Sequence, residues 1–277
     1  MATARSRALR GRALVVKLGG SAMEDPAATT ATLESVVALQ TLGVQLLLVH
    51  GGGKPIDRAM AAAGLVPKKV AGRRYTDAAT LEIVVRVLGE LNIDIARQIN
   101  ELGGRANGFR DADAFPVSGK RLALAGEDGS PIDLGFVGQP TAVNDGALLE
   151  FVENAITPVL PSLCRDENGW LNVNADTVAS AVAGAFDTEA VIFLTDTPGI
   201  LRDKKDANSR IDSLSVAECR RLIETGVIDG GMIPKVEACF EALAAGAERA
   251  VILDGRVPHG LLADFAGEPI AGTEIVP

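Results

Sequence analysis

Cysteine and histidine are scarce in this 277-residue chain, and their scarcity argues against two kinds of structural site. Three scattered cysteines and two histidines form no CxxC or HExxH pair. A disulfide framework or a zinc site of Cys and His ligands is therefore not expected, and no metal site is assigned to the chain itself. Cys164, Cys219 and Cys239 are interpreted as small, buried apolar residues.

Long apolar runs are also missing. No apolar stretch reaches about 18 residues, the length that a membrane-spanning helix needs. Residues 1–12 contain basic residues but lack the apolar core of a secretory signal. The sequence therefore predicts a cytoplasmic protein.

Basic residues are fewer than acidic ones. Lys and Arg number 27 against 36 Asp and Glu, which leaves a net charge of −9, and no run of basic residues follows one helix face. Nucleic-acid binding requires the opposite balance. An anion can still bind where basic side chains and backbone amides gather locally. Hydrophobic residues make up 47% of the chain, which supplies a large core and excludes a disordered chain.

Short apolar runs rich in β-branched residues alternate with longer amphipathic segments. The short runs are apolar at consecutive positions, as in strands buried on both faces of a parallel sheet, and cover 13–18, 44–50, 156–160, 190–195 and 249–254. Apolar residues spaced by three or four predict helices over 30–43, 77–103, 175–186, 215–225 and 234–245. This alternation predicts an α/β fold, a three-layer αβα sandwich around a central, mostly parallel sheet.

Two segments interrupt this pattern. Residues 107–138 are rich in Gly, Asp and Pro, which predicts hairpins or lid-like loops instead of another strand–helix unit. A Gly-rich turn near 168–174 is the candidate boundary between an N-terminal lobe, residues 1–170, and a C-terminal lobe, residues 171–277.

Glycines follow three of the predicted strands. Gly19-Gly20 follows the first, Gly51-Gly52-Gly53 and Lys54 follow the second, and a segment from Asp196 to Gly199 follows a later one. Ligands bind beyond the carboxyl ends of parallel strands, and glycines there expose backbone amides to an anion. Neither GxxxxGK[ST] nor GxGxxG occurs. Phosphate held by separate glycine turns and lysines remains possible, beside the alternative that these glycines serve tight turns only.

Isolated polar residues add to this pattern. Lys17 interrupts an apolar strand, where desolvating a lysine is costly, although it could also extend to water at the strand end. Lys235 follows Gly230-Gly231 at a predicted helix start, where the helix dipole also attracts anions, or is an ordinary surface lysine. In 172–176, Asn, Asn and Asp alternate before an apolar helix, and an N-cap at Asn174 with Asp176 in the first turn explains them equally well.

Taken together, the motifs resemble the amino acid kinase family, and within it the branch whose members phosphorylate N-acetyl-L-glutamate. Nine motifs occur in order along nearly the whole chain: VKLGGS (16–21), LLLVHGGGK (46–54), AGRRYTD (71–77), LGFVG (134–138), LNVNADTVA (171–179), LTDTPGIL (194–201), IDGGMIPKVEAC (228–239), ILDGRVPHGLL (252–262) and GTEIV (272–276). Each motif alone is modest, but nine in register are very specific.

The resemblance implies an enzyme of arginine biosynthesis that uses ATP to convert the side-chain carboxylate of N-acetyl-L-glutamate to an acyl phosphate. It implies that Lys17 and Lys235 stabilise the transferring phosphoryl group and that Asp176 orients them. The acyl substrate is expected at Gly52, Gly53, Arg74 and Asn172. ATP, carrying its own Mg²⁺, is expected at Gly19, Gly20, Asp196, Gly199, Ile200, Leu201, Gly230 and Gly231.

This chemistry agrees with the residue types. A carboxylate nucleophile is already ionised, so the reaction needs positive charge and exclusion of water instead of a strong base. His50 is accordingly interpreted as holding a backbone carbonyl. The fork of an arginine suits a carboxylate better than a lysine does. The doublet Arg73-Arg74, where the family usually has an apolar residue before the arginine, leaves open which of the two binds.

Other functions and assemblies remain as alternatives. One is a kinase acting on a carrier-linked aminoadipate or glutamate, and another is a non-catalytic nucleotide or amino-acid sensor on the same fold. The segment 108–129 is longer than its family counterpart and is shifted along the sequence. In the family this segment covers the acyl substrate, so the difference leaves the identity of that substrate open.

The stretch before Ala13 has one large aliphatic residue after the initiator, Leu9. We therefore expect a homodimer formed through the N-terminal lobe, as the family implies, instead of a hexamer, and weak or absent inhibition by arginine.

Overall fold

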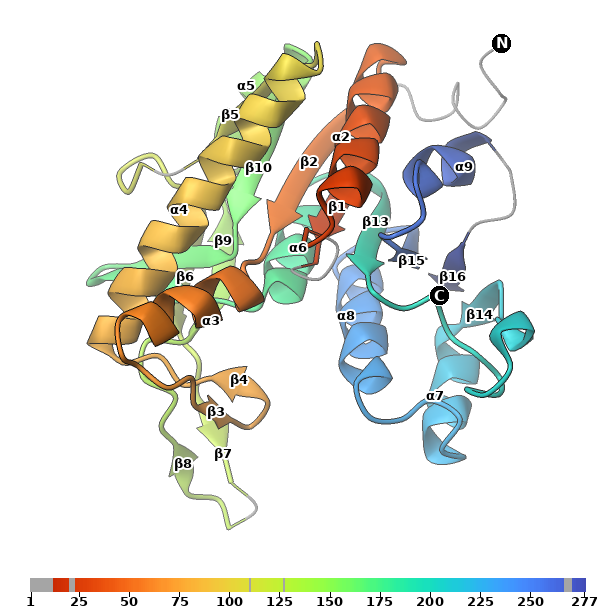
Figure 1. Cartoon of the computed structure of the whole chain (residues 1–277). Helices are drawn as coiled ribbons and strands as arrows, with labels where there is room; N and C mark the ends of the chain where they lie inside the picture. The colour runs from red at the N-terminus through yellow and green to blue at the C-terminus, as the bar shows by residue number, and fades with distance from the viewer. Residues whose placement is uncertain (1–11, 20–22, 110, 127, 267–270) are drawn as a thin grey trace.

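An eight-stranded sheet forms the centre of the computed structural model, which describes residues 12–19, 23–109, 111–126, 128–266 and 271–277 (Figure 1). Its strand order is β14-β16-β15-β13-β1-β2-β10-β5. The strands from β15 to β5 are parallel to one another, whereas β16 is antiparallel to β15 and parallel to β14. Their bounds are β1 Ala13–Leu18, β2 Gln45–His50, β5 Ala106–Gly108, β10 Thr157–Pro161, β13 Thr188–Thr195, β14 Ser213–Ser215, β15 Arg249–Asp254 and β16 Gly272–Val276.

Helices cover both faces of this sheet because successive strand side chains point to opposite sides. Val15, Leu47 and Phe193 belong to one buried cluster, and Leu14, Leu46 and Ile192 to another. The first cluster is covered by α5 (Asp145–Glu153), α6 (Ala175–Ala183), α7 (Val216–Glu224) and α8 (Met232–Ala244). The second is covered by α2 (Pro26–Thr41), α4 (Ala78–Glu101) and α9 (Gly260–Ala266). The predicted three-layer α/β architecture is confirmed.

A second sheet lies beyond the central one. It has four strands in the order β12-β11-β6-β9, and two short hairpins, β3–β4 and β7–β8, accompany it. Strand β10 leads through Ser162 directly into β11, so one strand path joins the two sheets. Their bounds are β3 Lys69–Val70, β4 Arg73–Arg74, β6 Val117–Arg121, β7 Leu124–Ala125, β8 Pro131–Ile132, β9 Gly138–Val143, β11 Leu163–Asp166 and β12 Gly169–Asn172. The hairpins expected in 107–138 are confirmed, while the four-stranded sheet was not predicted.

The predicted strands and helices all appear, with ends within about four residues of the expected ones. For α4, Asp77 is the N-cap and its carboxylate accepts from the Thr80 amide at 2.8 Å. Gly103 has a φ of +88° just after the helix ends, as expected of a left-handed stop. The short helices α3 (Gly53–Ala62), α5 and α9 were missed. Helices α3 and α5 bury only two residues each, and α9 is only seven residues long, so their apolar periodicity is brief.

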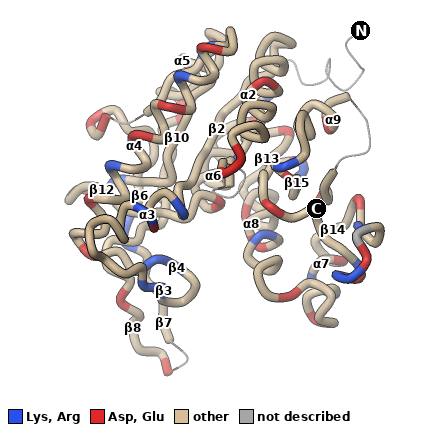
Figure 2. Tube along the Cα trace, viewed as in Figure 1, with Lys and Arg blue, Asp and Glu red and all other residues tan. Residues whose placement is uncertain are grey.

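The three cysteines are free and buried, which confirms their interpretation as core residues. Burial raises the pKa of the Cys164 thiol to about 12, so this side chain stays a neutral thiol. Acidic and basic residues are interspersed along the chain in the view of Figure 2. Within the part of the chain that the structure describes, no helix combines the length and apolar character needed to cross a bilayer.

The central sheet is continuous across the expected boundary between the two lobes. Strand β1 of the N-terminal lobe pairs along all of its residues with β13 of the C-terminal lobe. The residues near 168–174 form β12 and the start of α6. The segment on which the dimer expectation depends, residues 1–11, lies outside the described residues, as does Gly20 of the first glycine turn.

Candidate active site

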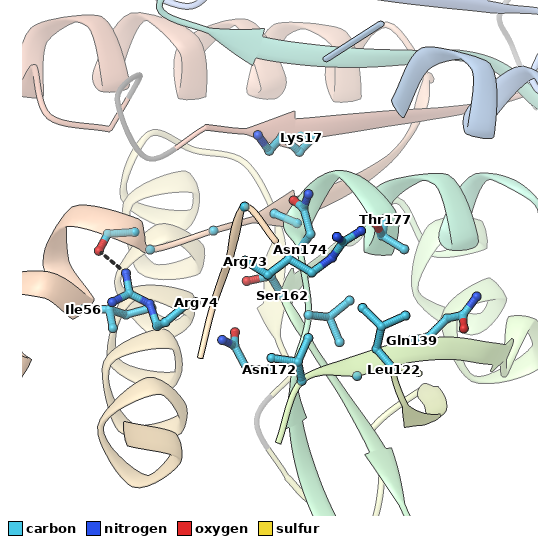
Figure 3. A pocket seen from close by; sticks show the side chains of 18 of the residues that line it. Lys17, Ile56, Arg73, Arg74, Leu122, Gln139, Ser162, Asn172, Asn174 and Thr177 are labelled. Atoms are coloured by element: carbon cyan, nitrogen blue, oxygen red, sulfur yellow. Dashed lines mark hydrogen bonds between the residues drawn. The ribbon is translucent and has the colours of Figure 1, made fainter. Parts of the chain in front are cut away.

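A cavity of about 480 Å³ opens beyond the carboxyl ends of β1 and β2 (Figure 3). The amino end of α6, the β3–β4 hairpin and the start of α3 also contribute to its wall. It brings together five of the expected site residues, which are Lys17, Gly52, Gly53, Arg74 and Asn172. These residues are up to 155 positions apart in the sequence, so only the folded chain assembles them.

Lys17 is a lysine in an otherwise apolar strand, and α6 supplies its partner. Its Nζ lies 2.7 Å from Asp176 Oδ1, with the two side chains only 12% and 18% exposed. A desolvated ammonium is stable when a carboxylate faces it. The pair therefore holds a positive charge at the cavity wall and fixes its position.

The polar residues before α6 cap the helix and also face the cavity. Asn174 is the N-cap, and its side chain accepts from the Asp176 amide at 3.0 Å. Asn172 Nδ2 donates to Thr76 Oγ1 at 3.0 Å. Both asparagines line the cavity. The capping interpretation is confirmed for Asn174, and the same segment brings two amide side chains to the site.

The second glycine turn leads into α3. This helix starts at Gly53, and its N-cap, Gly52, makes no side-chain capping hydrogen bond. The first backbone amides of α3 are therefore available to an anion. A Cβ on Gly52 would stand 2.8 Å from Leu88 Cδ2. A side chain at this position would thus displace Leu88, and the turn is also open to a ligand.

The two neighbouring arginines have different surroundings. Arg74 is 14% exposed, its Nη1 lies 2.6 Å from Asp57 Oδ1, and its Nη2 donates to the Gly53 carbonyl at 3.2 Å. Arg73 is exposed, and its Nη1 donates to the Ala71 carbonyl at 3.4 Å. Both line the cavity, and Figure 3 shows Arg73 near Asn174 and Thr177, with Arg74 turned toward α3. Arg74 is held in place, whereas Arg73 is not.

A second cavity of about 420 Å³ lies between the segment after β13 and the amino end of α8. Lys235 lies in the first turn of α8, with its Nζ 3.7 Å from Asp196 Oδ1. Five expected nucleotide residues line the cavity: Asp196, Gly199, Ile200, Leu201 and Gly231. Gly199 has a φ of +101°, and a Cβ there would meet Thr273 Oγ1 at 2.6 Å, so its backbone conformation requires glycine.

Two expected glycines have other surroundings. The Gly19 amide donates to the Leu194 carbonyl at 3.0 Å, and a Cβ on Gly19 would stand 2.5 Å from that oxygen. Gly230 has a φ of +51° in the turn before α8. Among the described residues, the linings of the two cavities include neither of them. Gly19 is therefore placed by close packing against the end of β13, and Gly230 by the backbone conformation of its turn.

The sequence motifs missed several cavity residues. Glu241 and Ser162 line the first cavity, and Lys204 and Asp229 line the second, where they form an ion pair. Asp229 lies inside a quoted motif and was not singled out. Glu241 carries no local signal, because its position in the cavity depends on how α8 packs. Among the described residues, no group of three or more His, Cys, Asp or Glu side chains is arranged to hold a metal.

His50 is buried at the end of β2, away from the cavity lining. Its Nδ1 lies 3.0 Å from the Gly51 carbonyl, and its Nε2 lies 3.1 Å from Asn92 Nδ2. This network assigns the proton to Nδ1, which donates to the carbonyl, while Nε2 accepts from Asn92. Burial lowers the pKa of His50 to about 4. The interpretation of His50 as a carbonyl-binding residue is confirmed.

We expect His50 to make stability depend on pH. The unfolded imidazole binds a proton below a pKa near 6.5, whereas the folded one does so only near 4, so acidification favours unfolding. Stability should fall by about 2 kcal/mol between pH 6.5 and 5. Urea unfolding of the wild type and of His50→Gln across this range measures it, with His259→Gln on the surface as control. An equal pH dependence in the wild type and His50→Gln would contradict the assignment.

The comparisons with known proteins agree with this geometry. A model of the amino acid kinase family matches residues 12–254, so the chain belongs to that family. Curated relatives named acetylglutamate kinase include one from Synechococcus elongatus, 42% identical over 271 residues that cover 96% of this chain and 87% of the relative. Another, from Desulforamulus reducens, is 40% identical over 267 residues, covering 96% and 92%. The family resemblance noted in the motifs is confirmed.

Solved structures share the fold. The smu.665 protein of Streptococcus mutans superposes with a TM-score of 0.78 at 28% identity, covering 95% of this chain and 98% of that one. N-acetylglutamate synthase from Neisseria gonorrhoeae, in complex with coenzyme A and N-acetyl-glutamate, reaches a TM-score of 0.82 at 22% identity over 99% of this chain and 61% of that chain. At that identity the second similarity supports the fold alone.

Proposed function

We propose that this kinase transfers the γ-phosphoryl group of ATP to the side-chain carboxylate of N-acetyl-L-glutamate, in arginine biosynthesis. The products are ADP and an acyl phosphate. The relatives named acetylglutamate kinase, about 40% identical over nearly the whole chain, bear out this expectation. The observation in the structure that carries the proposal is the desolvated Lys17–Asp176 pair at the wall of the cavity.

The reaction needs positive charge around the transferring phosphoryl group. A carboxylate oxygen of the acyl substrate attacks the γ-phosphorus, and the bond from that phosphorus to the β–γ bridging oxygen breaks, so ADP carries away the electron pair. Lys17 and Lys235 balance the negative charge of the transition state, and Asp176 keeps Lys17 in place. The amides at the start of α3 add partial positive charge. Mg²⁺ bound to ATP neutralises charge on the phosphates.

The acyl substrate occupies the first cavity in this proposal. Arg74 presents its guanidinium to a substrate carboxylate, in a position that Asp57 and the Gly53 carbonyl hold. Asn172 is fixed by Thr76 and provides an amide for the acyl group. Most of this wall comes from residues 1–170, which supports the assignment of acyl-substrate binding to an N-terminal lobe.

ATP occupies the second cavity in this proposal. Pro198, Val227 and Met232 give it an apolar wall suited to a base, and Lys235 at the amino end of α8 is suited to the phosphates. Ile200 shapes the cavity wall without offering a free polar group, because its side chain is buried, its amide donates to Thr273 Oγ1 at 2.8 Å and its carbonyl accepts from the Ile211 amide at 2.9 Å. All these residues lie within 171–277, the proposed C-terminal lobe.

An ADP-release assay tests the proposed function. We expect ADP release with N-acetyl-L-glutamate, and much less with L-glutamate, L-aspartate or carbamate at equal concentration. Faster turnover of a carrier-linked glutamate or aminoadipate than of N-acetyl-L-glutamate would support the first alternative. ATP binding in calorimetry without ADP release for any acceptor would support a sensor. A preparation carrying Lys17→Ala controls for contaminating ATPase.

We further propose a homodimer formed through the N-terminal lobe, with weak or absent inhibition by arginine, and a cytoplasmic location. Multi-angle light scattering with and without arginine, beside the ADP-release assay, tests the assembly. We expect twice the mass of one chain under both conditions. A hexameric mass, or inhibition by sub-millimolar arginine, would contradict this expectation.

A further inference from the structure

Arg73 and Glu241 line the first cavity from two different parts of the fold. Arg73 belongs to the β3–β4 hairpin, and Thr76, just after this hairpin, bridges to Gly135 in the segment that leads into β9. Glu241 belongs to α8, which packs on α6, β13 and β15 of the central sheet. The cavity therefore has a cationic side chain on the hairpin side and an anionic one on the helix side.

Neither side chain is held by a strong partner. The long bond from Arg73 to the Ala71 carbonyl, at 3.4 Å, contrasts with the ion pair that fixes its neighbour Arg74. Within the described part of the chain, no ion pair of 4.0 Å or less involves Arg73 or Glu241. Both side chains are exposed toward the cavity. They are consequently free to move when a ligand fills the space between the hairpin and α8.

The two charges already influence each other. The pKa of Glu241 is raised, chiefly because surrounding protein atoms remove water from the carboxylate, and the positive charge of Arg73 acts in the opposite direction. A carboxylate in a cavity that takes an anionic substrate weakens binding unless a cation neutralises it. Among the described residues that line this cavity, Arg73 is the cation without a carboxylate partner, since Lys17 faces Asp176, Lys54 faces Glu24 and Arg74 faces Asp57.

We propose that Arg73 and Glu241 form an ion pair across the cavity when the acyl substrate binds, and so close the β3–β4 hairpin onto α8. Closure expels water, and expelling water strengthens both this pair and the charges that act on the phosphoryl group. The inference rests on the proposed function in one respect, namely that this cavity takes the acyl substrate. Arg73 and Glu241 are positioning residues here, not catalytic ones.

Steady-state kinetics distinguish this ion pair from two simpler arrangements, in which Glu241 merely repels the substrate or Arg73 binds it directly. For a cross-cavity pair, Arg73→Ala and Glu241→Ala should each raise KM for N-acetyl-L-glutamate by about 3- to 5-fold, with kcat within about twofold. The double variant should be no worse than either single one, and the exchange Arg73→Glu with Glu241→Arg should restore much of the loss.

Other patterns overturn the proposal. If Glu241 merely repels the substrate, Glu241→Ala lowers KM. If Arg73 binds the substrate directly, Arg73→Ala raises KM while Glu241→Ala does not, and the charge exchange fails to rescue. Lys69→Ala on the same hairpin and Glu224→Ala on the neighbouring α7 are controls, because each removes the same charge from an exposed residue outside the cavity lining. Both should stay within about twofold of the wild type.

Cross-linking tests the closure without relying on activity. The three native cysteines are buried, so Lys69→Cys with Ala244→Cys supplies an exposed reactive pair on the hairpin and α8 that keeps both Arg73 and Glu241. A short bismaleimide joins the two new cysteines only when the hairpin approaches α8. We expect N-acetyl-L-glutamate to accelerate cross-linking several-fold, and the same cysteine pair combined with Glu241→Ala to respond much less.

This experiment also distinguishes the two hypotheses. Wild-type kinase activity with an unchanged cross-linking rate overturns the closure and leaves the function. Faster cross-linking without ADP release overturns the function and leaves the closure. If N-acetyl-L-glutamate gives no ADP release and does not accelerate cross-linking, both hypotheses are overturned.

Discussion

Lys17→Ala is expected to lower kcat by about 100-fold or more, while KM for either substrate changes by less than about threefold. The Lys17 ammonium lies at the end of β1, desolvated against Asp176 and facing the cavity. Negative charge on the phosphoryl oxygens is best balanced by such a fixed charge in the transition state, so the loss falls mainly on kcat. Lys235→Ala is expected to act in the same way from the other cavity.

Several variants sharpen the Lys17 test. Lys17→Arg keeps the charge but not the fit, since the native side chain is 12% exposed, and it should remain strongly impaired. Asp176→Asn should lower kcat less than Lys17→Ala, because the ammonium stays. Lys205→Ala removes an exposed lysine from outside both cavity linings and should have no effect. Near-normal kcat in a folded Lys17→Ala protein, by circular dichroism, would refute the role.

Arg74→Ala is expected to weaken binding of the acyl substrate by about 30- to 1000-fold, the equivalent of roughly 2–4 kcal/mol. The guanidinium offers a two-pronged contact to a carboxylate, in an orientation that Asp57 holds. The affinity for ATP should change by less than about threefold, because the second cavity does not include Arg74. Calorimetry with N-acetyl-L-glutamate and, separately, with a non-hydrolysable ATP analogue measures both effects.

Two companion variants distinguish charge from geometry at this position. Arg74→Lys keeps the charge but loses the fork, so most of the binding loss should remain. Asp57→Asn should weaken acyl-substrate binding less than Arg74→Ala, because the arginine is kept but held less firmly. Equal weakening of both ligands by Arg74→Ala, or a larger effect from Arg73→Ala, would contradict the assignment.

Local sequence patterns were sufficient to predict most strands of the central sheet. Consecutive apolar residues identified β1, β2, β10, β13 and β15, because a strand buried on both faces has no polar side. The antiparallel strand β16 and the four-stranded sheet were not predicted, because short strands gain their stability from partners distant in the sequence. Strand β6, for example, pairs with β9 and β11, and β6 itself alternates little between apolar and polar residues.

The sequence by itself determined the α/β class, the glycine turns at strand ends, and the unusual positions of Lys17 and Lys235, because these depend on residue type and short spacing. Arg74 was identified from the family resemblance of its motif. Only the tertiary structure decided what those residues contact. It paired Lys17 with Asp176 and Arg74 with Asp57, and it gave Gly19 a steric role against Leu194. It also brought Glu241 to the first cavity. Such contacts arise when helices pack across a sheet, and no local periodicity records which distant side chains then meet.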